Sequence, residues 1–513
     1  MEEVAKEVPT SEASASEEPS AQTPEGGSPK KGIKPLWLDR FFQISDRGSS
    51  ILRELLGGLV TFLAMFYILN VNSGILCNWF SGFTAEGNVW LYGSGEAAVY
   101  VSAMDAYQGL FIATALSAGI TTIVMGVFGK LPVGLASGMG INSMVATYVM
   151  GRLGFSFAQA MCLVFIDGII FLILSLTPVR GWIVRAIPKD LKIAISAGIG
   201  LFIAYLGLKT SGIISVDGAL AMGDLTNPST LLCLIGVVLV CALSCLPQKN
   251  KILTWISRFS VIIVMLVLGI IEASLAEGGV ATASSGFLLS SEGNWGNFGQ
   301  LFGVAFRGFD AFVKPEAYVV VFTLLFIDFF DTTGTLVGVE IGAGMVDKNG
   351  NLTVDDRNAM ITDAAGTVLG SVMGTTTVTS FVESTSGVAA GARTGLASVL
   401  TGLLFCLSTF LYPILGIFSG AVPNIALVFV GVCMFKNLAD LDWKNWISIV
   451  SGFVTVVTMI CMASISDGIA FGFITYSLCK AISGKFSKKD IPVTVIAVLF
   501  LGLYVMEFAS GIK

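Results

Sequence analysis

The sequence predicts an all-α polytopic membrane protein with about 14 transmembrane segments. Of its 513 residues, 54% are hydrophobic and only 12% are charged, whereas soluble globular proteins carry about 25% charged residues. Apolar stretches near the length needed to cross a bilayer recur along the chain. So few charges cannot cover a soluble surface of this size, and no basic stripe points to nucleic acid. The soluble classes and nucleic-acid binding are therefore excluded.

The chain begins with a polar tail, and the apolar segments follow in order. Residues 1–35 are rich in Glu, Ser and Pro, which predicts a disordered cytoplasmic tail rather than a signal peptide. The first seven segments are expected at 53–77, 108–128, 131–150, 155–176, 190–208, 229–246 and 255–275. The second seven are expected at 316–345, 358–373, 374–392, 394–412, 423–438, 445–463 and 466–482. An additional C-terminal apolar helix at 491–509 fits either a fifteenth crossing or a helix at the interface.

The distribution of Lys and Arg orients the chain. Basic residues precede the first segment and recur on every second turn, whereas the loop at 78–107 has none. Because cytoplasmic loops carry an excess of Lys and Arg, we expect a multi-pass protein of the plasma (inner) membrane with a cytoplasmic N-terminus. Arg152 is the lone exception to this pattern.

The segments divide into two groups of seven, which predicts an inverted repeat. With an odd number in each half, the second half enters the membrane from the opposite side. Pro188 and Pro423 stand at matching starts of the fifth and twelfth segments. The third and tenth segments are the two most interrupted by Gly, Ser and Thr, at 135–142 and 374–387. Interrupted segments at matching places indicate a binding site at the membrane midplane.

The tenth segment contains a stretch that suits a strand better than a helix. Residues 378–382 are rich in β-branched and aromatic side chains, and Gly374 and Gly387 on either side allow the chain to change conformation. Unwound backbone cannot face lipid, because its polar groups would lack partners. The stretch is therefore expected to line a cavity or to pack against protein.

Carboxylates supply the candidate chemistry of the spans. The chain has no histidine, so any proton relay must use carboxylates. An acid at the bilayer centre costs about 2.5–3.5 kcal/mol and usually faces a polar interior. Asp328 and Asp331 share a helix face and repel, so one of them should hold a proton more tightly. We therefore interpret Asp331 and Glu383 as functional. The other acids of the spans are interpreted as structural: Asp167, Glu340 and Asp363 as acids at an interface or in helix packing, and Asp467 as a helix cap.

Several motifs resemble those of the AzgA-like purine permeases, a branch of the nucleobase/ascorbate transporter superfamily. The stretch at 53–69 resembles the first span of that family, A-S-G-M-G-I-N at 136–142 resembles its third-span motif, and F-I-D-F-F-D-T-T-G-T-L-V-G-V at 326–339 resembles its eighth. T-S-F-V-E-S-T-S-G-V-A-A-G-A-R-T-G at 379–395 resembles its tenth. The last two motifs are long and highly specific, and the resemblance runs from Arg53 to at least Gly484.

The resemblance implies an architecture of two domains with short strands in the broken third and tenth segments. A core domain would combine 53–176 with 316–412, and a gate domain would combine 188–275 with 422–484. It also implies the site residues. Those expected to bind substrate are Asp331, Glu383, Asn142, Phe381, Ser384 and Thr332, and those expected to couple protons are Asp328, Asp331 and Glu383.

The function implied is import of a purine nucleobase (guanine, hypoxanthine or adenine) by cation symport, with the proton as the coupling ion and sodium as the alternative. The motion expected is elevator-like alternating access. Homodimers occur among related transporters, and no cofactor or metal is expected. The chain shows no nucleophile–base set, so an enzyme is not expected. Ser137 stands where the motif usually has proline, and 384–386 is more polar than the motif usually is there, so another nucleobase, such as xanthine or uracil, stays open. A uniporter or an anion exchanger on the same fold is a further alternative.

Overall fold

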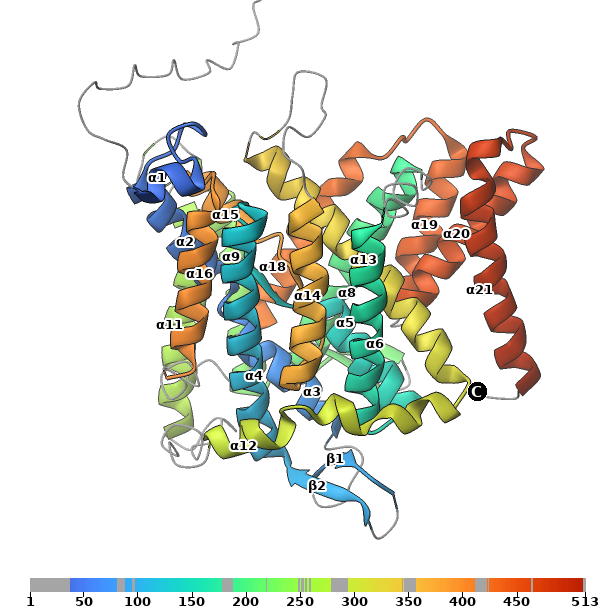
Figure 1. The fold of residues 1–513 in the computed structure, drawn as a ribbon, viewed down its shortest axis with the longest axis horizontal. Coiled ribbons are helices and arrows are strands. Elements are labelled where there is room, and N and C mark those ends of the chain that lie inside the picture. Colours follow the sequence, from blue (N-terminus) through green and yellow to red (C-terminus); the bar gives the residue numbers. More distant parts are fainter. Residues whose placement is uncertain are drawn as a thin grey trace, which may run out of the picture.

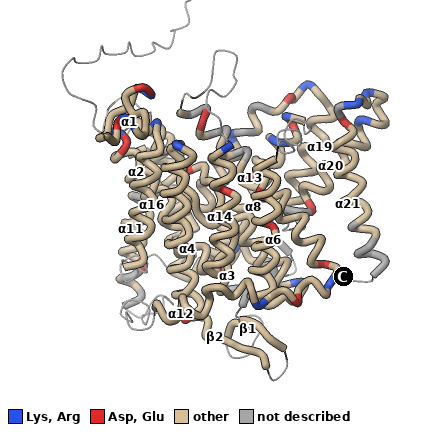
Figure 2. The backbone as a smooth tube through the Cα atoms, viewed as in Figure 1, with Lys and Arg blue, Asp and Glu red and all other residues tan. Residues whose placement is uncertain are grey.

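The structure is a computed structural model. It describes residues 37–80, 88–94, 97–177, 188–217, 219–247, 250, 253, 256–257, 260–277, 294–343, 345, 357–410, 422, 424–462 and 465–510. The predicted tail at 1–35 and the start of the twelfth segment at Pro423 lie outside these residues. Figure 1 shows most of the helices standing side by side, with a small hairpin at one end. In Figure 2 the charged positions gather at the two ends of the helices, and a few acidic positions lie between them. The protein is an integral membrane protein built from helices.

The helices follow the predicted segments closely. The first half contains α1 (Trp37–Phe42), α2 (Ile51–Met65), α3 (Ile68–Phe80), α4 (Ala103–Val124), α5 (Met139–Met144), α6 (Phe157–Leu176), α8 (Lys189–Thr210), α9 (Pro228–Ser244) and α11 (Ser260–Glu277). The second half contains α12 (Asn294–Leu301), α13 (Glu316–Gly342), α14 (Arg357–Met373), α15 (Ser384–Ala390), α16 (Gly395–Ser408), α18 (Asn424–Phe435), α19 (Trp446–Cys461), α20 (Ile465–Ile482) and α21 (Ile491–Ser510).

Short π-helical and 3-10 turns extend several of these helices. The π-helical turns are η2 (Met125–Gly129) after α4 and η3 (Val145–Arg152) after α5. The 3-10 turns are η4 (Val304–Arg307), η5 (Phe309–Val313), η7 (Lys436–Asp440) and η8 (Lys488–Asp490). Within the described ranges, four helical stretches are long and apolar enough to cross a membrane, namely Ile51–Cys77, Ala103–Gly129, Phe157–Leu176 and Lys189–Thr210. Six shorter apolar helical stretches are also found in these ranges, and the count of 14 crossings stays a prediction.

Among the described residues, six strands form three two-stranded sheets. Two are local hairpins, β1 (Asn88–Tyr92) with β2 (Val99–Ser102) and β4 (Ile214–Asp217) with β5 (Ala219–Met222). The third joins β3 (Leu135–Ser137) to β6 (Val378–Ser380) in antiparallel register, across the two halves of the chain. Short strands in the third and tenth segments are thus confirmed. Sequence reasoning missed both hairpins.

The first segment, expected at 53–77, consists of α2, which ends at Met65, and α3, which begins at Ile68 after two turn residues. Two local predictions need correction. The strand in the tenth segment ends at Ser380 rather than at residue 382, and a turn follows it. Gly387 does not mark a change of conformation, since it lies inside α15. A Cβ there would collide with Thr61 on α2, so close packing accounts for this glycine.

Two helix pairs surround the strands, and each pair joins a helix of the first half to a helix of the second half. Helix α4 packs against α16, and α6 packs against α14. A Cβ added to Gly119 on α4 would lie 2.9 Å from the carbonyl oxygen of Gly402 on α16, and one added to Gly168 on α6 would lie 2.9 Å from the amide nitrogen of Val368 on α14. Small residues at such crossings let backbones approach closely. The matched pairs agree with the inverted repeat.

Helix α21 covers one side of the bundle. It packs along α20, and its Phe500 meets Phe322 of α13 with ring centroids 5.8 Å apart. Figure 1 shows α21 running beside α19 and α20 over much of their height. This orientation favours a crossing over a helix that lies in the interface.

Candidate functional site

The site is built where the two broken segments meet. Leu135, Ala136 and Ser137 pair with Ser380, Thr379 and Val378, in that order. Two further backbone bonds extend the ladder: the N–H of Gly138 donates to Thr377 (3.0 Å), and the N–H of Phe381 donates to Gly134 (3.0 Å). All six strand residues are buried. Each strand thereby satisfies backbone groups of the other that could not remain unpaired in a membrane.

In each half, the segment that follows the strand carries a polar residue close to the place where β3 and β6 pair. β3 leads directly into α5, which carries Asn142 in its first turn and a half. β6 leads through a turn that holds Glu383 to α15. Gly374 permits the approach to β6, because its φ of +88° is one that side chains with a Cβ rarely adopt. The sequence prediction of a special conformation at Gly374 is confirmed.

Glu383 and Asp331 are the two acids of the site that keep partial exposure. The hydroxyl of Tyr67 donates to Oε1 of Glu383 over 2.6 Å, a length typical of a bond to a charged acceptor. Asp331 comes from the middle of α13, which packs against β6 and α15. Its carboxylate lies within electrostatic range of Glu383 and Asp363. The structure therefore brings the two acids predicted from the sequence to one place.

Asp363 on α14 has a different environment from these two acids. It is fully buried, and its Oδ1 accepts from the backbone N–H (2.7 Å) and the hydroxyl (2.6 Å) of Ser380. Its Oδ2 accepts from Thr332 over 2.6 Å, and the Thr332 hydroxyl lies 2.9 Å from that of Thr379. This carboxylate fastens β6 to α13 and α14, as the packing role predicted for it requires. Thr332, predicted to bind substrate, is engaged with Asp363 and Thr379.

Asn142 lies in a buried polar cluster behind the strands. Its Nδ2 donates to Oδ1 of Asn72 over 2.6 Å, and its Oδ1 accepts from the hydroxyl of Thr376. The Nδ2 of Asn72 in turn donates to Thr114 (2.7 Å) and Thr375 (2.9 Å). The cluster links the first span, α4, α5 and the approach to β6. Asn142 thus holds these elements in place, and it also lies next to the paired strands β3 and β6.

Ser137, which departs from the family motif, also joins this cluster. Its hydroxyl lies 3.0 Å from that of Thr375 and accepts from Asn72 over 3.2 Å. A proline at this position would lack the hydroxyl that makes both contacts. The departure therefore changes the support of the strands, and the hydroxyl has partners within the protein.

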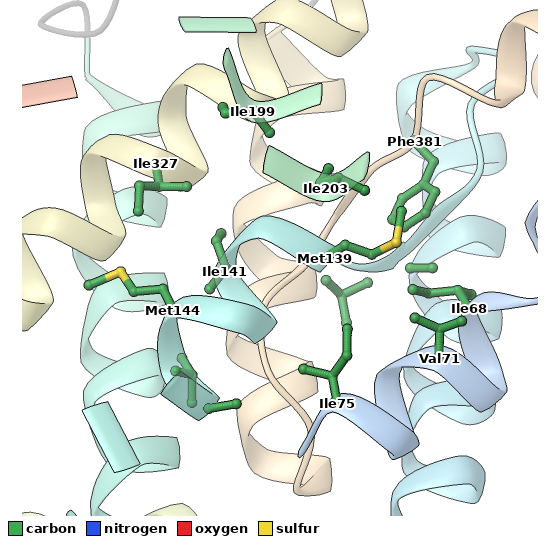
Figure 3. Packing of buried hydrophobic residues seen from close by; sticks show 14 of the residues in the cluster. Ile68, Val71, Ile75, Met139, Ile141, Met144, Ile199, Ile203, Ile327 and Phe381 are labelled. Atoms are coloured by element: carbon green, nitrogen blue, oxygen red, sulfur yellow. The ribbon is translucent and has the colours of Figure 1, made fainter. Parts of the chain in front are cut away.

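Phe381 and Ser384 flank Glu383 on the chain, and both are buried. Figure 3 shows the ring of Phe381 beside Met139, the first residue of α5, with Ile68 of α3 nearby. These side chains form an apolar wall drawn from both broken segments. The hydroxyl of Ser384 accepts from the N–H of Gly134 over 2.9 Å, so Ser384 ties the start of α15 to the residue that precedes β3.

Sequence reasoning missed Tyr67 and Asn72 as members of the site. Both lie in the first span, where no site residue was predicted. The signal available was the polar run Asn70, Asn72 and Ser73 inside an apolar segment. Buried polar side chains need partners, so this run pointed to a polar neighbour within the membrane.

Chemically, the arrangement offers two partly exposed carboxylates and an apolar wall. Ionised carboxylates only accept hydrogen bonds, so the site suits a small planar molecule that presents N–H groups. Apolar side chains can pack against the faces of such a molecule, as in most small-molecule sites. Asp328, one of the three predicted coupling residues, is not part of this surface, since it is fully buried on α13.

The chain is similar to known permeases over most of its length. The Permease family (Xan_ur_permease) matches residues 95–471, more than half of the chain. A guanine/hypoxanthine permease of Bacillus subtilis, PbuG, is 36% identical over 456 residues, which cover 87% of this chain and 95% of that protein. An adenine permease of Escherichia coli, AdeQ, is 33% identical over 465 residues, which cover 90% of this chain and 95% of that protein.

Solved structures show the same fold at low sequence identity. The transmembrane domain of the cyanobacterial bicarbonate transporter BicA has a TM-score of 0.55 at 13% identity, covering 82% of this chain and 96% of that one. The murine anion transporter Slc26a9 has a TM-score of 0.54 at 13% identity, covering 90% of this chain and 74% of that one. These similarities concern the fold alone.

Proposed function

Because this chain belongs to the permease family, we propose that it carries a purine nucleobase, namely guanine, hypoxanthine or adenine, into the cell. It is a membrane transporter rather than an enzyme. Relatives named for guanine, hypoxanthine and adenine support the purine assignment. Their similarity extends over nearly the whole membrane part of the chain.

The observation that carries the proposal is the convergence of Asp331 and Glu383 beside the strand crossing. Glu383 accepts hydrogen bonds from N–H groups on one edge of the base, and Asp331 accepts from another edge. Phe381 and Met139 pack against the ring (Figure 3). Tyr67 fixes one oxygen of Glu383 and leaves the other oxygen of that carboxylate for the substrate.

Uptake is cation symport, in which the inward gradient of a coupled cation supplies the energy. The coupling ion is the proton. Asp328, Asp331 and Glu383 carry the coupling, because the spans contain no histidine that could do so. Sodium is the alternative ion. A protonophore that leaves uptake unchanged would refute the proton as the coupling ion.

The site moves by an elevator-like shift of the core domain (53–176 with 316–412) against the gate domain (188–275 with 422–484). Packing supports this division: α4 with α16 and α6 with α14 form pairs inside the proposed core, while α8 with α18 and α19 with α20 form pairs inside the proposed gate. The excess of Lys and Arg on alternate loops supports a cytoplasmic N-terminus in the plasma (inner) membrane.

Binding to the purified protein tests the substrate. Adenine, guanine, hypoxanthine, xanthine and uracil are titrated against the wild type, Glu383→Gln and the exposed-site control Asp224→Asn. A hydrogen bond to a charged group contributes about 1.5–3 kcal/mol, so Glu383→Gln should weaken purine binding about 10- to 150-fold. The control should bind as the wild type does.

Other outcomes of the titration separate the alternatives. Binding of xanthine or uracil without any purine would make one of these the substrate. Binding of no base would contradict a nucleobase transporter and favour the anion exchanger, although an acid at Glu383 speaks against an anion site.

A further inference from the structure

Asp167 on α6 and Asp328 on α13 are two acids without adequate partners. Both are fully buried. Neither oxygen of Asp167 accepts a hydrogen bond, and Oδ1 of Asp328 accepts none. The one bond that the structure records to the pair is donated by Thr367, to Oδ2 of Asp328 over 2.8 Å. Three of the four carboxylate oxygens are therefore buried and unpartnered, an arrangement that native proteins rarely tolerate.

The two acids lie where α6, α13 and α14 meet, within electrostatic range of each other. Phe171 of α6 packs edge-on against Phe329 of α13, with ring centroids 6.2 Å apart. The other charged groups that act on Asp328 are also acids, Asp363 on α14 and Asp331 on α13. In the described part of the chain, no Lys or Arg forms an ion pair with Asp167 or Asp328.

Two negative charges on such a pair are strongly disfavoured. An ionised carboxylate buried without donors or a counter-charge is strongly disfavoured, and a second one beside it adds repulsion. The contrast with Asp363, which has three donors in the same region, shows that the helices can supply donors where a carboxylate has to stay charged. The pair therefore has a high affinity for a cation, and a proton is the smallest cation that can remove one of the two charges.

We propose that Asp167 and Asp328 together form the binding site of the coupling proton, separate from the substrate site. This rests on the proposed proton-coupled transport. A proton from the aqueous phase adds to one carboxylate oxygen and is shared with the neighbouring carboxylate, and its departure restores the negative pair. Asp331 lies one helical turn from Asp328 and acts on its charge. A base bound at Asp331 therefore changes the free energy of a negative charge on Asp167 and Asp328. This change links the substrate site to the proton site.

Transport by reconstituted protein tests the proposal. Wild type, Asp167→Asn and the control Asp224→Asn are placed in vesicles, and purine binding is compared with accumulation driven by an inward proton gradient. We expect Asp167→Asn to bind purine and to lose gradient-driven accumulation, while the control behaves as the wild type. Accumulation by Asp167→Asn equal to that of the wild type would overturn the proposal. Failure of the wild type itself to respond to the gradient would instead refute proton coupling as the function.

A second variant covers the case in which Asp167→Asn does not fold. Thr367→Val keeps the side-chain shape and removes the one recorded donor to the pair. Since that donor favours the charged form of Asp328, its loss should move the midpoint of the pH dependence of uptake to higher pH. An unchanged midpoint, or one moved to lower pH, would overturn the proposal. So would uptake driven by a sodium gradient in the wild type and lost in Asp167→Asn.

Discussion

Replacing Thr332 by valine separates a support role from a substrate contact. The Thr332 hydroxyl donates to Asp363 over 2.6 Å and lies 2.9 Å from the Thr379 hydroxyl. Valine preserves the shape and removes the donor, leaving the buried Asp363 with one fewer bond. A hydrogen bond to a charged group is worth about 1.5–3 kcal/mol. Because the Thr379 hydroxyl can turn toward Asp363, we expect a loss of unfolding free energy near the lower end, about 1.5 kcal/mol.

Thermal unfolding in detergent measures this loss with a thiol-reactive dye. The structure contains buried free cysteines, among them Cys77, Cys162 and Cys233, which become reactive as the helices separate. The Thr332→Val variant should unfold at a lower temperature than the wild type and should rank the five bases in the wild-type order. An unchanged unfolding temperature together with an altered ranking would show that Thr332 contacts the substrate, and the argument for a support role would fail.

Thr226→Val is the matched control, because Thr226 is exposed and water can replace its hydroxyl. It should leave the unfolding temperature unchanged. Thr226 donates from its hydroxyl (2.6 Å) and its N–H (2.9 Å) to Asp224, and these bonds hold the pKa of that carboxyl below its usual range. The control should therefore raise the pKa of Asp224 toward the usual value, without affecting transport.

Four further substitutions provide three tests of contacts in the structure. Ser384→Ala leaves the buried N–H of Gly134 without its acceptor, so unfolding free energy should fall by about 1–3 kcal/mol with base selectivity retained; altered selectivity would contradict this. Gly402→Leu forces α16 away from Gly119 on α4 and should cost about 1–3 kcal/mol or more, measured as a lower unfolding temperature. Asp331→Asn and Glu383→Gln should weaken purine binding non-additively in a double-mutant cycle, whereas strict additivity would contradict the placement of both acids at one site.

The helices were predictable because membrane spans are specified by a local property. An apolar run of sufficient length, with basic residues at alternate ends, places a helix whatever its neighbours are. The fifth segment, expected at 190–208, is α8 at Lys189–Thr210. The break between Met65 and Ile68 was not predictable in this way. No Gly or Pro marks it, and the polar contacts that accompany it, from Tyr67 to Glu383 and from Asn72 to Thr375, come from the other half of the chain.

The sequence could predict several residues of the candidate site, but not which partner each of them has. Scarcity of charge singled out the acids of the spans, and the structure brings Asp331 and Glu383 together. Sequence spacing could not separate acids that have donors from acids that have none, because the donors lie far away along the chain. Asp363 receives three bonds while Asp167 receives none, although both were interpreted as packing acids. Ser384 looked like a ligand beside Glu383, and its actual partner is Gly134.

The pairing of β3 with β6 also constrains how the protein is made. During synthesis Leu135–Ser137 leaves the ribosome long before Val378–Ser380 exists, yet each strand depends on the other for backbone hydrogen bonds. Unpaired strand backbone has no stable place in lipid. The third segment must therefore wait in a hydrated or otherwise protected setting, such as the insertion machinery, until the tenth segment arrives. Its final placement is thus a late event in biogenesis, and a nascent chain stopped before residue 378 should be a target for quality-control proteolysis.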